Sequence, residues 1–330
     1  MRIDVHGHLV PEEWLDTYRR AGPGTWPRVV DDPDGSVWVE SSDVARWPVP
    51  PDLRDAGSRT DALRAGGVDS QLLLPPTPLA DYALPAPAGR ASARLFNETV
   101  SDLARHSAGR FLPSCTVPLQ DPDAAVEEVT YAARRLDARA VLLGTNLARF
   151  QFDSDELFPF FTRVSELGLP LVLHPNERLG DERLARHRLA NLVGNPVDTT
   201  VAVAQLIFGG VLERLPELRV CLVHGGGALP FLIGRWVHGA EALGVGRITR
   251  SPDAYLDQIY ADTIVHDDRA LELAVAVLGA DHLVIGSDDP YAMGDPELYD
   301  RIARAGLSED LLSATAGRLL GLDATATPAG

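Results

Sequence analysis

The chain has 330 residues, of which 45% are hydrophobic, and a formal net charge of −17. This apolar content is sufficient for a large buried core, and the length suits either two ordinary domains or one α/β barrel. The negative charge argues against nucleic acid as a partner and gives no support for binding an anionic membrane. An anionic substrate would therefore need positive charge gathered locally in its pocket.

All 30 basic residues are arginine. Without lysine the chain cannot form a Schiff base, and no carbamylated lysine can bridge two metal ions. A metal site in this protein is therefore expected to be mononuclear or to consist of histidines and carboxylates only.

The two cysteines, Cys115 and Cys221, lie inside apolar runs. This placement predicts buried free thiols in a cytoplasmic protein, without a disulfide framework or a cysteine-rich zinc site. The first residues enter a strand pattern directly, so no signal peptide is expected. No apolar stretch reaches the roughly 20 residues that a membrane-spanning helix requires.

Short apolar runs alternate with helical patterns along almost the whole chain. Strands are predicted near residues 2–6, 69–74, 111–116, 139–144, 170–174, 219–224, 257–262 and 282–286. Helices are predicted at 90–106, 123–136, 155–167, 197–215, 228–243, 268–278 and 297–305. Strands that alternate with helices in this way favour a (β/α)8 TIM barrel, which is an α/β fold, over an open sheet.

Residues 9–57 depart from this alternation, because Pro, Gly and Asp are dense there and a helical pattern begins only at about Gly57. An insertion of this length after the first strand indicates a lid or subdomain rather than a plain loop. We therefore predict one barrel domain over residues 1–322, carrying the insertion 9–57, followed by a frayed tail at 323–330.

Five polar residues end short apolar runs: His6, His8, His174, His224 and Asp288. In a TIM barrel the carboxyl ends of the strands form the active site. His6 and His8 are two residues apart on one strand, so their side chains share a face and can chelate one ion. His174 and Asp288 add a third nitrogen and a carboxylate, and such a set with an open position is typical of catalytic Zn²⁺.

His224 precedes three glycines, which allow a close approach of backbone at the start of the next helix. It could be a fifth ligand or a general base, and we favour the acid/base role because imidazole titrates near neutral pH. The five remaining histidines lie in helical or polar stretches and are interpreted as surface or capping residues; they are His106, His187, His238, His266 and His282.

These residues belong to motifs that resemble the metal-dependent amidohydrolase superfamily, in its aminocarboxymuconate semialdehyde decarboxylase branch. The motifs keep the family order and cover essentially the whole chain. They are Ile-Asp-Val-His-Gly-His-Leu-Val-Pro at 3–11, Gly-Val-Asp-Ser-Gln at 67–71, Val-Pro-Leu-Gln-Asp-Pro at 117–122, Leu-Val-Leu-His-Pro at 171–175, His-Gly-Gly-Gly at 224–227, Leu-Ile-Gly-Arg at 232–235 and Gly-Ser-Asp-Asp-Pro-Tyr at 286–291.

The resemblance implies roles for individual residues. His6, His8, His174 and Asp288 would hold the metal, usually zinc, with Mn²⁺ or Co²⁺ as alternatives, and His224 would be the catalytic acid/base. Substrate carboxylates would be bound by arginines at the positions of Arg46 and Arg235, where Arg235 reaches the neighbouring subunit's site in a homodimer. For each arginine the alternative is an ordinary solvated side chain.

Two positions depart from the family pattern. Asn176 stands where the decarboxylase has a Trp, which makes Asn176 a candidate substrate-binding residue of different shape and polarity. Asp289 replaces a residue that is typically Tyr. The two histidines at positions 6 and 8 resemble this branch. Hydroxybenzoate decarboxylases of the same superfamily often carry Glu at the first of these two positions.

The leading hypothesis is a Zn²⁺-dependent, non-oxidative decarboxylase of a small unsaturated or aromatic carboxylate. The same ligands could serve a hydrolase of an amide or lactone, or a hydratase. A catalytically silent binding protein on a barrel scaffold is the hypothesis from a different class. The presence of all five site residues counts against the silent scaffold.

Overall fold

A computed structural model describes residues 1–21, 27–40, 46–176 and 182–322. The tail predicted to fray, 323–330, lies outside the described residues.

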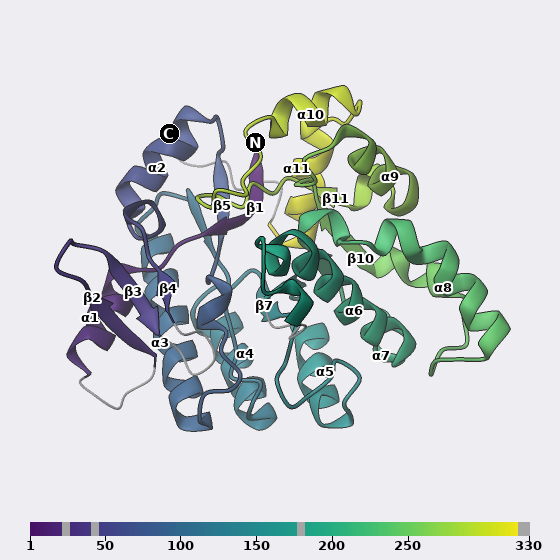
Figure 1. Cartoon of the computed structure of the whole chain (residues 1–330), viewed down its shortest axis with the longest axis horizontal. Helices are drawn as coiled ribbons and strands as arrows, with labels where there is room; N and C mark the ends of the chain where they lie inside the picture. Colours follow the sequence, from purple (N-terminus) through teal and green to yellow (C-terminus); the bar gives the residue numbers. More distant parts are fainter. Residues whose placement is uncertain (22–26, 41–45, 177–181, 323–330) are drawn as a thin grey trace.

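Eight parallel strands form the centre of the molecule (Figure 1). They are β1 (Ile3–His8), β5 (Ser70–Leu74), β6 (Phe111–Pro113), β7 (Val141–Gly144), β8 (Leu171–His174), β9 (Val220–Leu222), β10 (Ile259–Asp262) and β11 (Leu283–Val284). Each predicted strand overlaps one of these. The runs are apolar because barrel strands are buried on both faces, by the interior on one side and by helices on the other.

The strands close into a barrel through hydrogen bonds between two sheets, ordered β1-β5-β6 and β11-β10-β9-β8-β7. At one junction Val5 N donates to Ile285 O at 2.8 Å, and at the other Cys115 N donates to Ala140 O at 2.9 Å. The predicted TIM-barrel class is therefore confirmed.

Helices surround the barrel (Figure 1). They are α2 (Ala56–Ala65), α3 (Ala86–Arg105), α4 (Pro122–Arg135), α5 (Phe158–Glu166), α6 (Asn195–Phe208), α7 (Val211–Arg214), α8 (Leu229–Leu243), α9 (Asp268–Leu278), α10 (Leu298–Arg304) and α11 (Glu309–Leu319). The predicted helix 197–215 is two helices, α6 and α7, because Gly210 adopts a left-handed φ of 75°. A Cβ at Gly210 would lie 2.4 Å from Arg247 O, so only glycine permits this break. Helix α11 was not predicted.

The insertion contains a helix and a small antiparallel sheet, on the left of Figure 1. The elements are α1 (Glu12–Arg20), β2 (Arg28–Asp31), β3 (Val37–Glu40) and β4 (Trp47–Pro48). The expectation that no helix precedes Gly57 is wrong, because Trp14, Leu15 and Tyr18 give α1 a buried face. This face belongs to a second hydrophobic cluster that includes Phe96 of α3.

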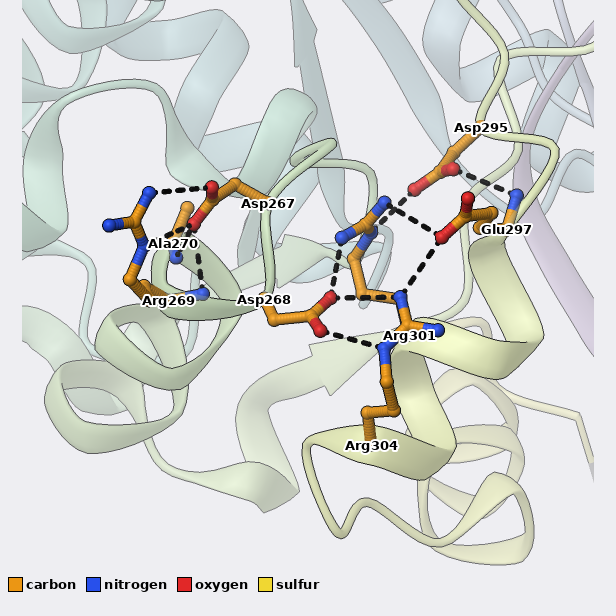
Figure 2. Close-up of polar contacts among 8 residues, drawn as sticks. All are labelled: Asp267, Asp268, Arg269, Ala270, Asp295, Glu297, Arg301 and Arg304. Carbon is orange, nitrogen blue, oxygen red and sulfur yellow. Dashed lines mark hydrogen bonds and ion pairs between the residues drawn. The ribbon is translucent and has the colours of Figure 1, made fainter.

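A group of charged side chains joins α9 to α10, the helix that follows the loop after β11 (Figure 2). Arg301 donates to Asp295 at 2.8 Å and to Asp268 at 2.5 Å, and its own side chain is only 9% exposed. Arg304 binds the same Asp268 but is 44% exposed. Burial raises the pKa of Asp295, yet Arg301 outweighs burial and holds that pKa below its ordinary value.

Replacing Arg301 with Met should lower the free energy of unfolding by about 3–5 kcal/mol, the usual cost of leaving one partner of a buried pair alone. The matched variant Arg304→Met removes a more exposed guanidinium and should cost about 1 kcal/mol or less. Because the folded-state pKa of Asp295 is depressed, the Arg301 contribution is present at neutral pH and is lost as the pH falls below about 4. Denaturant titrations at pH 7 and at a series of pH values below about 4 measure both effects, and equal losses in the two variants would contradict this assignment.

Candidate functional site

The five predicted site residues lie together at the carboxyl end of the barrel. His6 and His8 are on β1 and His174 ends β8, while His224 and Asp288 follow β9 and β11 closely. The His6 ring centroid is 5.1 Å from that of His174 and 5.4 Å from that of His224. Parallel strands bring their carboxyl ends to one edge, which is why residues far apart in sequence meet here.

Asp288 is the common neighbour of the histidines. Its Oδ1 lies 3.2 Å from Nε2 of His6 and 3.2 Å from Nε2 of His8, and its Oδ2 lies 3.9 Å from Nε2 of His224. His6, His174, His224 and Asp288 each offer one ligand atom, and these atoms all lie within 4.8 Å of one another. His8 joins the group through its contact with Asp288.

Four atoms that could bind a metal are buried in the site without a hydrogen-bond partner among the described residues. Nε2 of His6, His8 and His174 and Oδ1 of Asp288 are buried and make no hydrogen bond among the described residues. Buried polar atoms are normally paired, so several unpaired lone-pair atoms facing one another need a partner that is not protein. Three imidazole nitrogens and one carboxylate oxygen suit Zn²⁺ and related divalent ions. The residues therefore fit a single metal ion.

The electrostatics of the site agree with this fit. Burial lowers the pKa of His8, and burial together with the neighbouring histidines lowers that of His174 well below its ordinary value, which favours the neutral imidazole that binds metals. Burial also opposes a charge on His6, but Asp288 and Asp262 outweigh it and raise the His6 pKa to about 10. The negative charge that favours a proton on His6 equally favours a metal cation.

His224 differs from the other four residues in its exposure. Its side chain is 20% exposed, whereas those of His6 and His8 are fully buried. Its backbone is left-handed, with φ of 55°, and so is that of Asp288, with φ of 59°. Such conformations cost of order 1–3 kcal/mol in non-glycine residues, and they are more frequent at functional sites than elsewhere.

Two buried carboxylates that the sequence analysis did not single out hold this arrangement. Asp4 accepts hydrogen bonds from His6 N at 2.9 Å and from Ser287 Oγ at 2.6 Å, so it joins β1 to the residue before Asp288. Asp262 bonds the His6 ring at 2.7 Å. Asp262 ends the run Ile-Tyr-Ala-Asp, the same pattern of a polar residue at a strand end that identified the histidines.

The three residues predicted to bind substrate have different surroundings. Asn176 is buried two residues after His174, and its amide is paired with the backbone of Asn146 at 3.1 and 2.9 Å. Arg46 donates to Asp32 at 2.7 Å and stacks on Trp38, so its contacts join it to the insertion sheet. Arg235 is exposed on α8 and makes no hydrogen bond or ion pair with the described residues. Their roles toward a substrate stay predictions.

Comparison with known proteins now identifies the family. A family model described as amidohydrolase matches residues 3–322. The chain belongs to this amidohydrolase family. The resemblance inferred from the motifs is therefore confirmed, and the family match spans both the barrel and the insertion.

Amidohydrolase relatives of this chain are named as decarboxylases. The 2-amino-3-carboxymuconate-6-semialdehyde decarboxylase of Dictyostelium discoideum is 28% identical over 98% of this chain and 92% of its own length. A gamma-resorcylate decarboxylase of a Rhizobium species is 26% identical over 73% of this chain and 77% of its own length.

Solved structures share the fold. The 5-carboxyvanillate decarboxylase of Sphingomonas paucimobilis has a TM-score of 0.80 at 23% identity, covering 97% of this chain and 98% of that one. A dihydroxybenzoic acid decarboxylase of a Polaromonas species, which contains bound manganese, has a TM-score of 0.80 at 19% identity, covering 98% and 97%. Within the described ranges of this chain, no helix is long and apolar enough to cross a membrane.

We expect His174→Ala and Asp288→Ala to lose stoichiometric metal, because each removes an atom of the buried donor group. His224→Ala should retain metal, since the three Nε2 atoms and Oδ1 remain. Metal content of purified variants after dialysis, measured by atomic emission, checks this. Wild-type metal content in the Asp288 variant would refute its role as a ligand, and metal loss in the His224 variant would make His224 a ligand too.

Proposed function

We propose that this amidohydrolase is a metal-dependent, non-oxidative decarboxylase of a small unsaturated or aromatic carboxylate. The convergence of unpaired buried donor atoms at the barrel mouth carries the proposal. The decarboxylase names of relatives that align over most of the chain support this reaction over hydrolysis or hydration. The acidic chain leaves a carboxylate substrate dependent on local cations, which a metal and an arginine would provide.

In this proposal His6, His8, His174 and Asp288 hold one ion, Zn²⁺ in the first place and Mn²⁺ or Co²⁺ as alternatives. The bound manganese of the Polaromonas structure supports a divalent ion of this kind without favouring zinc. When bound, the ion would polarise a substrate oxygen and stabilise negative charge there. The protein residues contribute a rigid donor set, because three of the four side chains lie on strands β1 and β8.

His224 is the proton-transfer residue of the proposed reaction. Cleavage of the bond to the carboxylate carbon releases CO₂ and leaves its electron pair on the remaining carbon. The imidazolium of His224 then supplies the proton that forms the new C–H bond. Its partly exposed side chain makes it the most accessible of the five residues to a substrate at the barrel mouth.

Arg46, Arg235 and Asn176 are the proposed substrate-binding residues. Guanidinium groups pair with carboxylates through two parallel hydrogen bonds. Arg235 has no partner among the described residues, so its guanidinium is available. Arg46 would have to leave Asp32 in order to bind a substrate.

We also propose a homodimer in which Arg235 acts in the neighbouring subunit's site. Helix α8, which projects on the right of Figure 1, exposes Phe231 at 78% and Leu243 at 75%, while Val201 of α6 is 43% exposed. Trp236 of α8 contacts Phe208 at the end of α6, so the two helices are adjacent. Exposed apolar residues on two adjacent helices are ones that a subunit interface would cover.

The proposed location is cytoplasmic. Cys115 and Cys221 are free and buried, and unpaired thiols are typical of a reducing compartment.

The reaction is tested by CO₂ release from zinc-, manganese- or cobalt-loaded protein. The substrates are aminocarboxymuconate semialdehyde and a panel of small unsaturated and aromatic carboxylates. We expect CO₂ from at least one of them, with turnover reduced about 100- to 10,000-fold in His224→Ala, the usual contribution of an acid/base residue. His106→Ala, which removes a histidine that is 75% exposed, is the matched control and should leave turnover unchanged.

Products of water addition or hydrolysis without CO₂ would replace the decarboxylase with a hydratase or hydrolase on the same metal site. Absence of stoichiometric metal in protein supplied with all three ions would contradict the metal-dependent enzyme altogether.

The shared site is tested by mixing two inactive variants. If Arg235 acts across the interface, Arg235→Ala and His224→Ala subunits form hybrid dimers with one complete site, and random mixing restores about a quarter of wild-type activity. Light scattering of each variant confirms that dimers persist. A mixture as inactive as its components, with dimers intact and hybrids detected by mass spectrometry, would contradict the role of Arg235 across the interface.

A further inference from the structure

The carboxylate of Asp262 lies at the end of β10 and is fully buried beneath the metal-ligand group. One oxygen, Oδ2, is 2.7 Å from Nδ1 of His6. The other, Oδ1, accepts the backbone N–H of Gly225, directly after His224, at 2.8 Å. One side chain therefore touches both the proposed ligand His6 and the loop that carries the proposed proton donor.

The contact with His6 crosses a strand. Strand β11 lies between β10 and β1 in the barrel, so Asp262 and His6 are on strands that are not neighbours. Gly286 leaves the space for this contact, because a Cβ at that position would lie 2.7 Å from Asp262 Cβ and 3.0 Å from His6 Cβ. The absence of a side chain at Gly286 thus brings the two groups into hydrogen-bond distance.

The contact decides which nitrogen of His6 can bind a metal. A carboxylate only accepts hydrogen bonds, so Nδ1 of His6 carries a proton, and in the neutral ring Nε2 is the nitrogen left to bind a metal. Metal-binding histidines commonly donate their second ring N–H to a carboxylate or carbonyl, which fixes the ring and its tautomer. Nδ1 of His174 is held in the same way by Pro175 O at 2.8 Å.

The second contact holds the turn at His224. His224 and Gly225 both have left-handed backbone, with φ of 55° and 61°. Such a turn persists only when its surroundings fix it. The N–H of Gly225 is buried with Asp262 as its acceptor, and Asp262 also accepts Ile264 N at 3.3 Å.

We propose that Asp262 is a positioning residue that couples the metal site to the proton-transfer loop. Its two oxygens act at once, Oδ2 on the His6 ring and Oδ1 on the Gly225 N–H. The proposal rests on the proposed function, because it takes His6 as a metal ligand and His224 as the acid/base residue. It assigns to Asp262 no contact with the substrate.

The isosteric variant Asp262→Asn separates this role from simple packing. An amide has one accepting oxygen and one donating nitrogen, whereas the His6 ring, Gly225 N and Ile264 N all donate to Asp262. If the nitrogen faces His6, Nδ1 has to accept and the proton moves to Nε2, which can no longer bind metal. If the nitrogen faces Gly225, two donors meet and the buried N–H of the loop loses its partner.

The test measures Zn²⁺ and Co²⁺ affinity by competition with a chelator, in wild type and Asp262→Asn. We expect affinity to fall about 10- to 100-fold, the usual effect of removing a residue that orients a metal ligand. The absorption spectrum of the Co²⁺ protein should change as well, because the His6 ligand is altered. Hydrogen exchange of the peptide around Gly225, followed by mass spectrometry, should be faster than in wild type.

Glu128→Gln is the matched control. Glu128 is also a buried carboxylate that accepts two side-chain hydrogen bonds, from Arg94 at 2.9 Å and Asn97 at 2.8 Å, but it lies on α4. Its variant should be destabilised without a change in metal affinity. Melting temperatures of both variants show that any loss of affinity in Asp262→Asn exceeds the effect of lower stability.

The outcomes separate this inference from the proposed function. Wild-type protein that binds no metal contradicts the proposed function. Metal-binding wild type together with a folded Asp262→Asn variant of equal affinity and unchanged Co²⁺ spectrum overturns the role of Asp262 and leaves the proposed function standing. A tenfold or greater loss that is confined to Asp262→Asn supports the coupling.

Discussion

The hydrogen bonds that close the barrel between β1 and β11 determine where the site forms. Asp288 N donates to His6 O and His8 N donates to Asp289 O, both at 2.8 Å, so the first strand of the barrel is tied to the residues after the last. Asp4 reinforces this seam by binding both His6 and Ser287. Without closure, the histidines of β1 and the carboxylate of Asp288 would lie at opposite edges of an open sheet.

Closure also creates an electrostatic problem that a cation resolves. The closed barrel buries Asp4, Asp262 and Asp288 close to four histidines in space. Buried charges are costly unless they are paired. Asp4 and Asp262 are satisfied by hydrogen bonds, but Asp288 Oδ1 is not. A bound metal would pair with it, so metal binding and folding stability are expected to be thermodynamically linked.

Much of this arrangement could be predicted from the sequence, because a polar residue that ends an apolar run lies at the carboxyl end of a barrel strand. This pattern predicts that His6, His174 and Asp288 lie at the barrel mouth, and the same runs predict the strand positions. Asp262 has the same signature, but an Asp after a strand is also common in ordinary turns, so the pattern alone does not distinguish it. Only the distance to His6 across Gly286 distinguishes it.

Other features depend on tertiary contacts that leave no local pattern. Helix α1 has a buried face only because the insertion packs against α3, and the density of Pro and Gly that follows hides it in the sequence. The family resemblance predicts that Arg46 binds a substrate carboxylate, but in this structure its guanidinium lies against the carboxylates of Asp32 and Glu40. A residue's place in a motif therefore predicts strand-end geometry well and side-chain pairing poorly.

The four histidines at the barrel mouth differ in whether a neighbour fixes their second ring nitrogen. Nδ1 of His6 and of His174 is fixed by Asp262 and by Pro175 O, which leaves Nε2 of each as the lone-pair atom. Nδ1 of His224 has no such acceptor among the described residues. The His224 side chain is also 20% exposed, and its nearest carboxylate contact is Asp288 Oδ2, 3.9 Å from Nε2, so a molecule at the barrel mouth could reach its ring. In the proposed function the same residue type would thus serve as a rigid ligand or as a proton carrier, according to what its second nitrogen contacts.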